Sequence, residues 1–440
     1  MPEWRQSEKG ADVREKSDAG VNFCARLSES HKGIAMTTEV LKSINDLPSI
    51  PETFDPNVES YGLLRELQAK TPLVRTEFGF TLALKNRHMS LVTSDATRQI
   101  ETESKMIQGI TDGPIFEFTK LAMLFANGDL HKNRRTPVAK TFAFKLMDAM
   151  RPKIRELAED LVSNLVGKGP IDFLEEIGSQ LPARIIASIL GIPDKDVPVF
   201  RQWIQDTASA IGMIEAGDRE RIEQSLTEFM AYVGGLLEDR RNNPQDDFLT
   251  DYVQTTAAAG NLSEEEIRTQ CLGLILAGSD TTRASICMIL SELLQRPDQW
   301  ADFVADPDGL KRAAVEEGLR FQPVISAIPR ITLRDIEVDG YLVPEGSVFA
   351  ISVVAALRDP DVFEDPETFN IHRTDQQRWH YVFGAGAHRC VGEALARAEM
   401  EETLAVIARL APKTKLVGDP PRYGAGAIRP IDQMQVAFEA

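Results

Sequence analysis

The feature that most limits how this chain can fold is one long helical segment. Ser263 is followed three residues later by Glu266, which is the spacing of a capping box that starts a helix. Helical residue spacing then continues to Arg296, just before Pro297. At about 1.5 Å per residue, roughly 33 residues make a helix of about 50 Å. Such a helix would cross a whole domain, so the rest of the fold must be built around it.

The remaining sequence predicts a mainly α fold with a smaller β part. Residues 56–320 carry apolar side chains at three- and four-residue spacing, which is typical of helices. Strand-like segments are concentrated in residues 71–92 and 331–354, and the second contains an Asp339-Gly340 hairpin signal.

Composition limits the class of protein. The net charge of −18 argues against nucleic acid as the main partner, because phosphate binding needs a basic surface. The four cysteines are too few and too scattered for a disulfide framework. No secretory signal is visible, and no apolar stretch approaches the roughly 20 residues that span a bilayer. We therefore expect a soluble cytoplasmic protein, with residues 1–40 as a flexible N-terminal extension and residues 41–440 as a single domain.

The middle of the long helix has an unusual composition. Residues 276–282 read LAGSDTT, and Gly, Ser, Asp and Thr all weaken a helix, glycine by about 1 kcal/mol. Apolar residues on both sides predict that Asp280 and Thr281 lie at buried depth, where polar groups need a partner or a function. The segment is therefore either a packing glycine with solvated polar neighbours or a functional site.

A second unusual segment, residues 383–392, reads FGAGAHRCVG. Its glycines let the backbone approach a flat ligand, and the helix predicted for residues 391–411 would favour a thiolate at Cys390. Zinc needs four ligands and a nucleophilic thiolate needs a histidine and an orienting acid, whereas a haem iron needs one axial thiolate. The alternative is a buried free cysteine in a glycine-rich turn. This spacing would arise by chance on the order of once in a million chains of this length.

This loop resembles the haem-binding loop of the cytochromes P450. Three further segments resemble motifs of that family in the same order: AGSDTT at residues 277–282, EGLR at residues 317–320 and PETFNIHR at residues 366–373. Each of the three is weakly specific alone, but in this order with the cysteine loop they are very specific. The resemblance covers nearly the whole chain after about residue 45. It implies a P450-like catalytic domain with haem between the long central helix and the cysteine-loop helix.

The resemblance implies haem b (iron protoporphyrin IX) as the cofactor. Cys390 would be the proximal iron ligand, and its electron donation helps to break the O–O bond of dioxygen. Phe383 would pack beside the sulfur, and Gly392 would also contact the cofactor. Ala277 and Gly278 would lie in the oxygen-binding groove of the long helix, where Gly278 leaves room for oxygen.

Asp280 and Thr281 resemble the acid–alcohol pair of the family. Splitting dioxygen needs two protons, and a buried hydroxyl fed by a carboxylate and water is a suitable relay. The resemblance also implies that Thr281 opens a backbone hydrogen bond and bends the helix. The alternative is a purely structural polar kink.

Haem carries two propionates that need cationic partners. By the resemblance, His131 and Arg135 contact them from one helix face, since four-residue spacing brings both to the same side. Arg330 and His388 match the other two expected contacts. Each of the four alone could be an ordinary surface charge.

A further set of charges is expected to be structural. Glu317 and Arg320 lie three residues apart and can pair on one helical face. The resemblance adds Arg373 and makes the three a structural triad. The alternative is a solvated surface pair, worth well under about 1 kcal/mol.

Electrons are expected from a separate partner, because no reductase sequence is fused to this chain. Residues 129–153 carry a net charge of +5 within an acidic chain, and the resemblance places Arg389 and Arg397 nearby. This predicts a basic docking patch for a ferredoxin or flavodoxin-type donor with its reductase, on a monomer. Ordinary amphipathic helix charge is the alternative. The basic residues of this segment are Lys132, Arg134, Arg135, Lys140, Lys145, Arg151 and Lys153.

The predicted function is a monooxygenase that inserts one atom of O2 into a hydrophobic small molecule. The resemblance places the pocket lining at residues 100–124, 201–230, 324–328 and 425–431. A haem-binding redox or gas sensor without turnover is the alternative, but a sensor has no need of a proton relay. The apolar candidates for the lining are Ile107, Ile115, Phe116, Phe118, Met213, Val324, Ile325 and Ile328.

Overall fold

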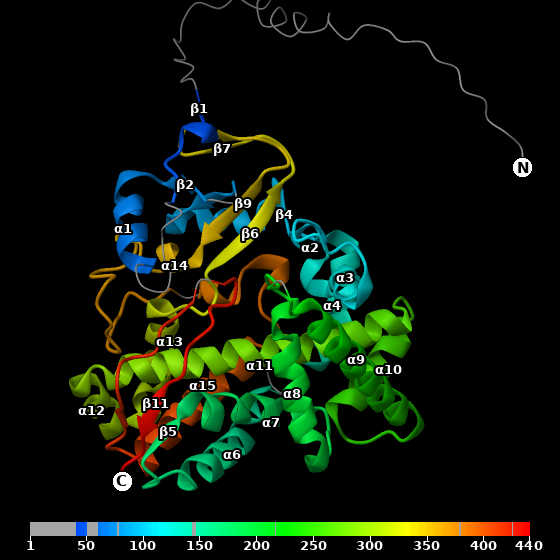
Figure 1. Cartoon of the computed structure of the whole chain (residues 1–440), viewed down its shortest axis with the longest axis vertical. Helices are drawn as coiled ribbons and strands as arrows, with labels where there is room; N and C mark the ends of the chain where they lie inside the picture. Colours follow the sequence, from blue (N-terminus) through cyan, green and yellow to red (C-terminus); the bar gives the residue numbers. More distant parts are fainter. Residues whose placement is uncertain are drawn as a thin grey trace, which may run out of the picture. The chain divides into compact units, whose positions relative to one another are not determined.

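The computed structural model confirms a mainly helical fold with small sheets (Figure 1). Residues Lys42–Ala440 form one compact unit. The predicted extension, residues 1–40, lies outside the described residues, so its flexibility stays a prediction. The structure describes residues 41–50, 60–76, 79–142, 147–215, 217–377, 380–424 and 426–440.

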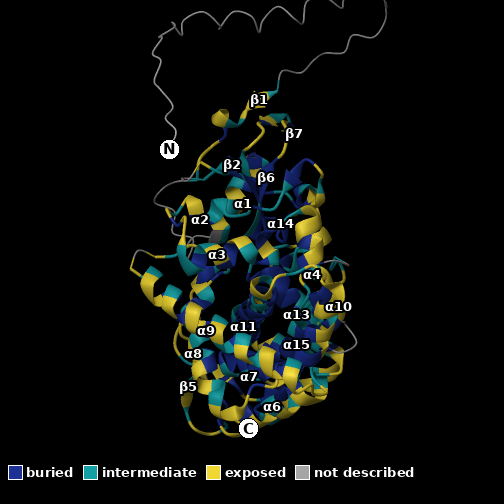
Figure 2. Ribbon diagram, turned by 90° about the vertical axis from the view of Figure 1, so that its right-hand side faces the viewer, coloured by how far each residue is buried: buried dark blue, intermediate teal, exposed yellow. Residues whose placement is uncertain are grey.

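Helices make up most of this unit. They surround one central helix, α11, and Figure 2 shows α11 and α15 mostly buried while the outer faces of the surrounding helices are exposed. The helices are α1 (Ser60–Lys70), α2 (Glu103–Met106), α3 (Gly113–Leu121), α4 (Gly128–Thr141), α6 (Arg151–Ser163), α7 (Gln180–Ile189), α8 (Val197–Thr207), α9 (Arg219–Asn242), α10 (Phe248–Ala259), α11 (Glu264–Leu294), α12 (Pro297–Ala305), α13 (Pro307–Phe321), α14 (Val353–Ala356) and α15 (Glu393–Leu410).

The β part consists of short strands in three sheets. The largest has the strand order β2-β3-β9-β6-β4, and the two three-stranded sheets have the orders β1-β8-β7 and β10-β11-β5. Figure 1 shows the five-stranded sheet and α1 at one end of the unit and most helices at the other. The strands are β1 (Lys42–Ser43), β2 (Leu73–Arg75), β3 (Thr81–Ala83), β4 (Thr97–Arg98), β5 (Pro170–Asp172), β6 (Ala327–Thr332), β7 (Ile336–Val338), β8 (Tyr341–Val343), β9 (Val348–Ser352), β10 (Lys415–Leu416) and β11 (Gln435–Ala437).

The predicted hairpin is confirmed. Val338 of β7 pairs with Tyr341 of β8, so Asp339 and Gly340 form a two-residue loop. Both loop residues have positive φ, 50° at Asp339 and 80° at Gly340. Two consecutive positive φ angles match the twist of a tight hairpin, which is why an Asp-Gly pair predicts one.

The capping box at the start of α11 is also confirmed. The Ser263 hydroxyl accepts a hydrogen bond from the Glu266 amide at 3.2 Å, and the Glu266 carboxylate accepts one from the Ser263 amide at 2.9 Å. The helix ends at Leu294, two residues before the expected end, and Pro297 opens α12. Proline is suited to the first turn of a helix but not to the interior, so the break falls here.

The core sits around α11. This helix packs against α7, α8, α9, α13 and α15, and most of its residues are buried. Its interior position carries the residues of the LAGSDTT segment to the middle of the unit. Within the described part of the chain, no helix has both the length and the apolar composition needed to cross a membrane.

Candidate active site

The cysteine loop is a pair of tight turns that ends at the start of α15. Tyr381–Phe383 and Gly386–His388 each form a short 3-10 turn. The Cys390 amide donates to the Phe383 carbonyl at 2.7 Å, which folds the loop back on itself. Gly386 has a φ of 62°, and a Cβ there would lie 2.7 Å from a methyl carbon of Thr93. The loop therefore needs glycine at this position.

Cys390 lies at the end of this loop, where the residue keeps a solvent-accessible surface although protein surrounds its thiol. Desolvation by the surrounding protein raises the pKa of its thiol, and a hydrogen bond from the Gly392 amide and the charges of Arg135 and Arg389 only partly oppose this. The Gly392 amide acts in the direction that the sequence predicted, because it lowers the pKa and so favours the thiolate, but burial outweighs it. A coordinated metal ion would favour the thiolate further, because it deprotonates a thiol outright.

Four basic side chains from three segments converge beside the cysteine loop. The rings of His131 and His388 lie 4.0 Å apart, centroid to centroid. Burial lowers the pKa of His388 to about 3, with smaller contributions from His131, Arg330 and Arg135. Burial also lowers the pKa of Arg330 to about 10, and its guanidinium donates to neutral acceptors, including the Gln99 side chain at 2.5 Å and the Val92 carbonyl at 3.2 Å.

This basic cluster fits the two propionates of haem. Among the described residues, no carboxylate contributes to the charge environment of the four side chains. Nε2 of His131 is buried and has no hydrogen-bond partner. Buried polar groups and charges without partners are costly, so an anionic ligand would stabilise the cluster. The structure thus brings together all four residues expected to hold the propionates.

The middle of α11 presents an open face although the helix lies in the core. Ala277 is exposed and Thr281 is partly exposed, while Leu276 and Ser279 are buried. A Cβ added at Gly278 would meet only a methyl carbon of Ile186, at 4.0 Å. This face leaves space for a flat cofactor and a small ligand.

The expected opening of the helix at Thr281 is not seen. The helix assignment is unbroken from Glu264 to Leu294. The Thr281 hydroxyl donates to the Ala277 carbonyl at 2.8 Å, one turn earlier in the helix. The hydroxyl is therefore satisfied by its own helix in this conformation.

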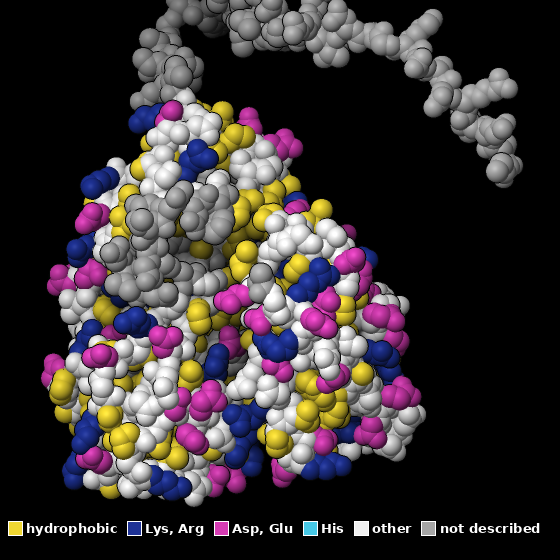
Figure 3. Space-filling view, viewed as in Figure 1, with side chains coloured by type: hydrophobic (Ala, Val, Ile, Leu, Met, Phe, Trp, Pro, Cys, Tyr) yellow, Lys and Arg dark blue, Asp and Glu magenta, His cyan; other side chains and the backbone are white. Residues whose placement is uncertain are grey.

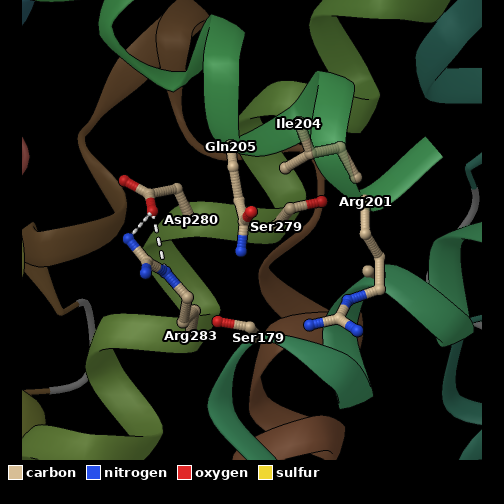
Figure 4. Close-up of a pocket in the computed structure, with 8 residues that line it drawn as sticks. Ser179, Arg201, Ile204, Gln205, Ser279, Asp280 and Arg283 are labelled. Carbon is tan, nitrogen blue, oxygen red and sulfur yellow. Dashed lines mark hydrogen bonds and ion pairs between the residues drawn. The ribbon is translucent and has the colours of Figure 1, made fainter. Parts of the chain in front are cut away.

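Asp280 faces a different side of α11 from Thr281. At about 100° per residue, positions 279 and 283 lie roughly opposite the face that 277 and 281 share, and position 280 lies on its flank, about 100° from position 281. There the Asp280 carboxylate accepts from Nε of Arg283 at 2.9 Å, and Nη2 of Arg283 binds the same oxygen (Figure 4). Arg283 was not predicted, although its three-residue spacing from Asp280 is a signal that could have identified it.

The Asp280–Arg283 pair lines a small polar cavity between α11, α7 and α8 (Figure 4). The space open to water centres is about 20 Å³, and one ordered water needs about 10–15 Å³. The Ser179 hydroxyl and Nε of Arg201 are buried here without hydrogen-bond partners. Such a site is suited to an ordered water. The lining residues are Ser179, Ala183, Arg201, Ile204, Gln205, Ser279, Asp280 and Arg283.

Glu317, Arg320 and Arg373 also come together. The Glu317 and Arg320 side chains are fully buried and form two hydrogen bonds, of 2.7 and 2.8 Å. Nε of Arg373 lies 3.3 Å from the Glu317 carboxylate. This places the three charges in the interior, where the solvated-pair alternative does not apply.

Comparisons with known proteins agree with this site. The sequence pattern of the family described as "Cytochrome P450" matches residues 185–302 and 310–411. "Cytochrome P450-pinF1, plant-inducible" from Rhizobium radiobacter is 40% identical over 381 residues, which are 86% of this chain and 90% of that protein. The chain belongs to the cytochrome P450 family. Membership implies a haem-thiolate cofactor and monooxygenase chemistry.

Two further relatives extend the comparison. "Mycinamicin IV hydroxylase/epoxidase" from Micromonospora griseorubida is 31% identical to this P450 over 68% of this chain and 75% of that protein. The crystal structure of CalO2 superposes with a TM-score of 0.81, at 24% identity, covering 88% of this chain and 98% of that one. The CalO2 likeness supports the fold.

The predicted basic docking patch is only partly present in this P450. Arg134 is buried and donates to the Glu266 carboxylate at 2.9 Å, so its inclusion in the patch was wrong. Arg135 instead points toward the cysteine loop, where it donates to the Arg389 carbonyl. Lys132 and Lys140 are exposed. Lys145 lies outside the described residues.

The other basic residues of the patch are largely neutralised. Arg389 and Arg397 both pair with Glu393, at 2.6 and 3.0 Å, and Arg397 also pairs with Glu316 at 2.6 Å. Glu393 is the first residue of α15, so Arg397 reaches it along the helix at four-residue spacing and Arg389 reaches it from the end of the cysteine loop. Lys/Arg and Asp/Glu are likewise mixed over the face drawn in Figure 3.

The residues expected to line the substrate pocket fall into three groups. Ile115, Phe118 and Val324 are buried in the main hydrophobic core, so they do not line an open space as expected. Ile107 and Met213 are largely exposed, at 62% and 69%. The partly buried residues, whose exposure suits a pocket wall, are Phe116, Ile325 and Ile328.

Proposed function

We propose that this P450 uses O2 to insert one oxygen atom into a hydrophobic small molecule, with electrons from a separate ferredoxin- or flavodoxin-type donor. The single observation that carries the proposal is the convergence of one cysteine, four basic side chains without carboxylate partners, and the open face of α11. Haem bound there would supply the binding and reductive cleavage of dioxygen.

In this proposal Cys390 holds the iron, and the basic cluster binds and orients the cofactor. Burial lowers the pKa values of Arg330 and His388, and neighbouring basic side chains lower that of His388 further. Propionates beside them would favour the protonated forms and so raise both pKa values. Part of the binding energy would therefore come from removing an electrostatic penalty already present in the protein.

Asp280 and Thr281 would move protons toward the open face of α11. The Thr281 hydroxyl can donate there only when it leaves the Ala277 carbonyl, to which it now donates at 2.8 Å. Asp280 lies on the flank of this face, in an ion pair with Arg283. The carboxylate would take a proton from water in the polar cavity and turn toward Thr281, so release from Arg283 is part of the transfer.

An apolar substrate is supported by the partly buried Phe116, Ile325 and Ile328. Relatives whose names state a substrate point the same way: one is a mycinamicin IV hydroxylase/epoxidase, and another, from Mycolicibacterium smegmatis, is a steroid C26-monooxygenase.

The proposal is tested by supplying the haem-loaded chain with a ferredoxin, its reductase and NADPH. A chemically diverse library of apolar compounds is first screened for shifts of the haem spin state. At least some of the compounds that shift the spin state should stimulate NADPH consumption and yield products heavier by one oxygen atom. A thiolate-haem spectrum with no compound-stimulated NADPH consumption would instead support a sensor without turnover.

A further inference from the structure

The C-terminal loop, defined here as residues 426–431, pairs with the segment that leads into β6. Ile428 forms an antiparallel bridge with Ile325. The Arg429 amide donates to the Val324 carbonyl at 2.7 Å. In Figure 1 the C-terminal part of the chain, in red, reaches the end of β6 nearest the helices. The C-terminal loop and the segment that contains Val324 and Ile325, about a hundred residues apart in sequence, thus lie side by side. Together they are called the wall below.

The Arg429 side chain ties this wall to the core. It is only 2% exposed. Its guanidinium donates to the Tyr61 hydroxyl at 2.9 Å, to the Gln322 side-chain oxygen at 3.2 Å and to the Pro323 carbonyl at 3.2 Å. A fourth bond, of 3.3 Å, reaches the Gly424 carbonyl just before the loop. One side chain therefore joins α1, the end of α13 and both sides of the wall.

All four acceptors are neutral. The guanidinium also lies 5.5 Å from the Tyr61 ring centroid and 5.4 Å from that of Tyr423, within the range of cation–π attraction. Among the described residues, Arg429 forms no ion pair; the Glu292 carboxylate accepts from Gln322 rather than from Arg429. A buried cation without a counter-charge adds little net stability, so its main effect is to fix the positions of its acceptors.

Anchoring Arg429 also fixes which way the neighbouring side chains face. Successive side chains of an extended segment point to opposite faces, so Ile428 points to the face opposite Arg429, where it packs against residues of the main hydrophobic core. Ile428 and its partner Ile325 are both partly buried. A one-residue shift in the pairing of the C-terminal loop with the segment at Ile325 would exchange the faces of Ile428 and Arg429. The Arg429 guanidinium would then point to the side where Ile428 now lies.

The wall lies next to the basic cluster. Arg330, which belongs to that cluster, is on β6, and Ile328 lies between it and Ile325. At about 3.3 Å per residue, Ile325 and Arg330 are within roughly 17 Å along the chain. Arg429 thus fixes one end of a segment whose other end contacts the site proposed for the haem propionates.

We propose that Arg429 is a specificity-determining positioning residue, which sets where Ile325 and Ile428 stand in the substrate-facing wall. The proposal rests on the proposed function, because it assumes that haem lies beside Arg330 and His388. It does not require Arg429 to touch substrate. It requires that the shape of the wall, and hence the size of ligand admitted above the haem, depends on this one guanidinium.

The test compares two azoles that bind haem iron in the haem-loaded full chain. Imidazole is small enough to reach the iron without the wall, whereas phenylimidazole also needs an apolar surface. In Arg429→Met the Kd for phenylimidazole should change by about tenfold, as expected when a few apolar contacts are misplaced. The Kd for imidazole should stay within about twofold, or roughly 0.4 kcal/mol. Equal changes for both azoles, or none, would overturn the proposal.

Arg358→Met is the matched control. Arg358 is also buried, lies 3.7 Å from the centroid of the same Tyr61 ring and donates to the Phe321 carbonyl, but it has no hydrogen bond to the C-terminal loop. Its variant should keep the wild-type ratio of the two Kd values, even where stability falls. The same change of ratio in both variants would show a general effect of instability and contradict the specific role.

Two further variants keep the test informative if Arg429→Met loads little haem. Tyr61→Phe removes one acceptor and should shift the Kd ratio in the same direction by a smaller amount, and Arg429→Lys should restore part of the wild-type ratio. No shift in either variant would count against the role of Arg429. If the wild-type chain itself gives no azole spectrum, the proposed haem function fails instead, so the two failures are distinguishable.

Discussion

Replacing Arg320 should be among the most damaging single changes in this protein. Its side chain is fully buried and forms two hydrogen bonds to Glu317, of 2.7 and 2.8 Å. It also donates to the carbonyls of Leu357, Pro366 and Thr368 at 3.1, 2.8 and 3.1 Å. Removing one partner of a buried ion pair costs about 3–5 kcal/mol, because the remaining charge stays buried. The three carbonyls also lose a hydrogen-bond donor. The expected cost in free energy of unfolding therefore lies toward the upper end of that range.

The assay is urea denaturation of Arg320→Met alongside the haem content of the purified protein. The free energy of unfolding should fall by about 3–5 kcal/mol, and little haem-loaded protein should be obtained. The double variant Glu317→Gln with Arg320→Met should be less damaged than Arg320→Met alone, because it removes the buried carboxylate that has lost its main partner, while Arg373 keeps its ion pair with Asp375. Normal haem loading and wild-type stability of Arg320→Met would refute the reasoning.

Two more predictions concern catalysis and pH. Thr281→Ala should keep haem binding but raise peroxide release relative to product during turnover, because the relay hydroxyl is lost; unchanged coupling would contradict the assignment. Lys105 is buried, which lowers its pKa to about 8, and its ammonium donates to the Gly212 carbonyl at 2.5 Å. Since the unfolded chain holds this proton up to a pKa of about 10.4, stability should rise with pH between those two values. Lys105→Met should lose that rise in urea denaturation at several pH values, and an identical pH dependence would argue against it.

Local signals in the sequence predicted several parts of the fold well. The capping box at Ser263 and the proline at position 297 bound α11 to within two residues, and Asp339-Gly340 marked the hairpin. These features depend on backbone geometry over a few residues, which the side chains themselves dictate. The Glu317–Arg320 pair was equally accessible, because spacing alone puts both on one face, whereas Arg373 came from the family resemblance.

Features that depend on tertiary packing could not be predicted. Arg134 looked like surface charge, but α4 turns it inward to Glu266, which lies 132 residues later in the chain. Asp280 was expected to act with Thr281 in the relay, whereas the structure ties its carboxylate to Arg283, three residues later in the helix. The raised pKa of the Cys390 thiol follows from desolvation, which outweighs the nearby amide and arginines. Each outcome depends on which neighbours fill a space, and no local pattern encodes that.

The most direct test of the central claim is a ferrous–CO spectrum of the purified full chain, wild type and Cys390→Ser. The account predicts a thiolate-type band in the wild type, because Cys390 is the sulfur beside the basic cluster. It predicts that Cys390→Ser loses this band. Absence of the band from haem-loaded wild-type protein, or its persistence in Cys390→Ser, would contradict the account.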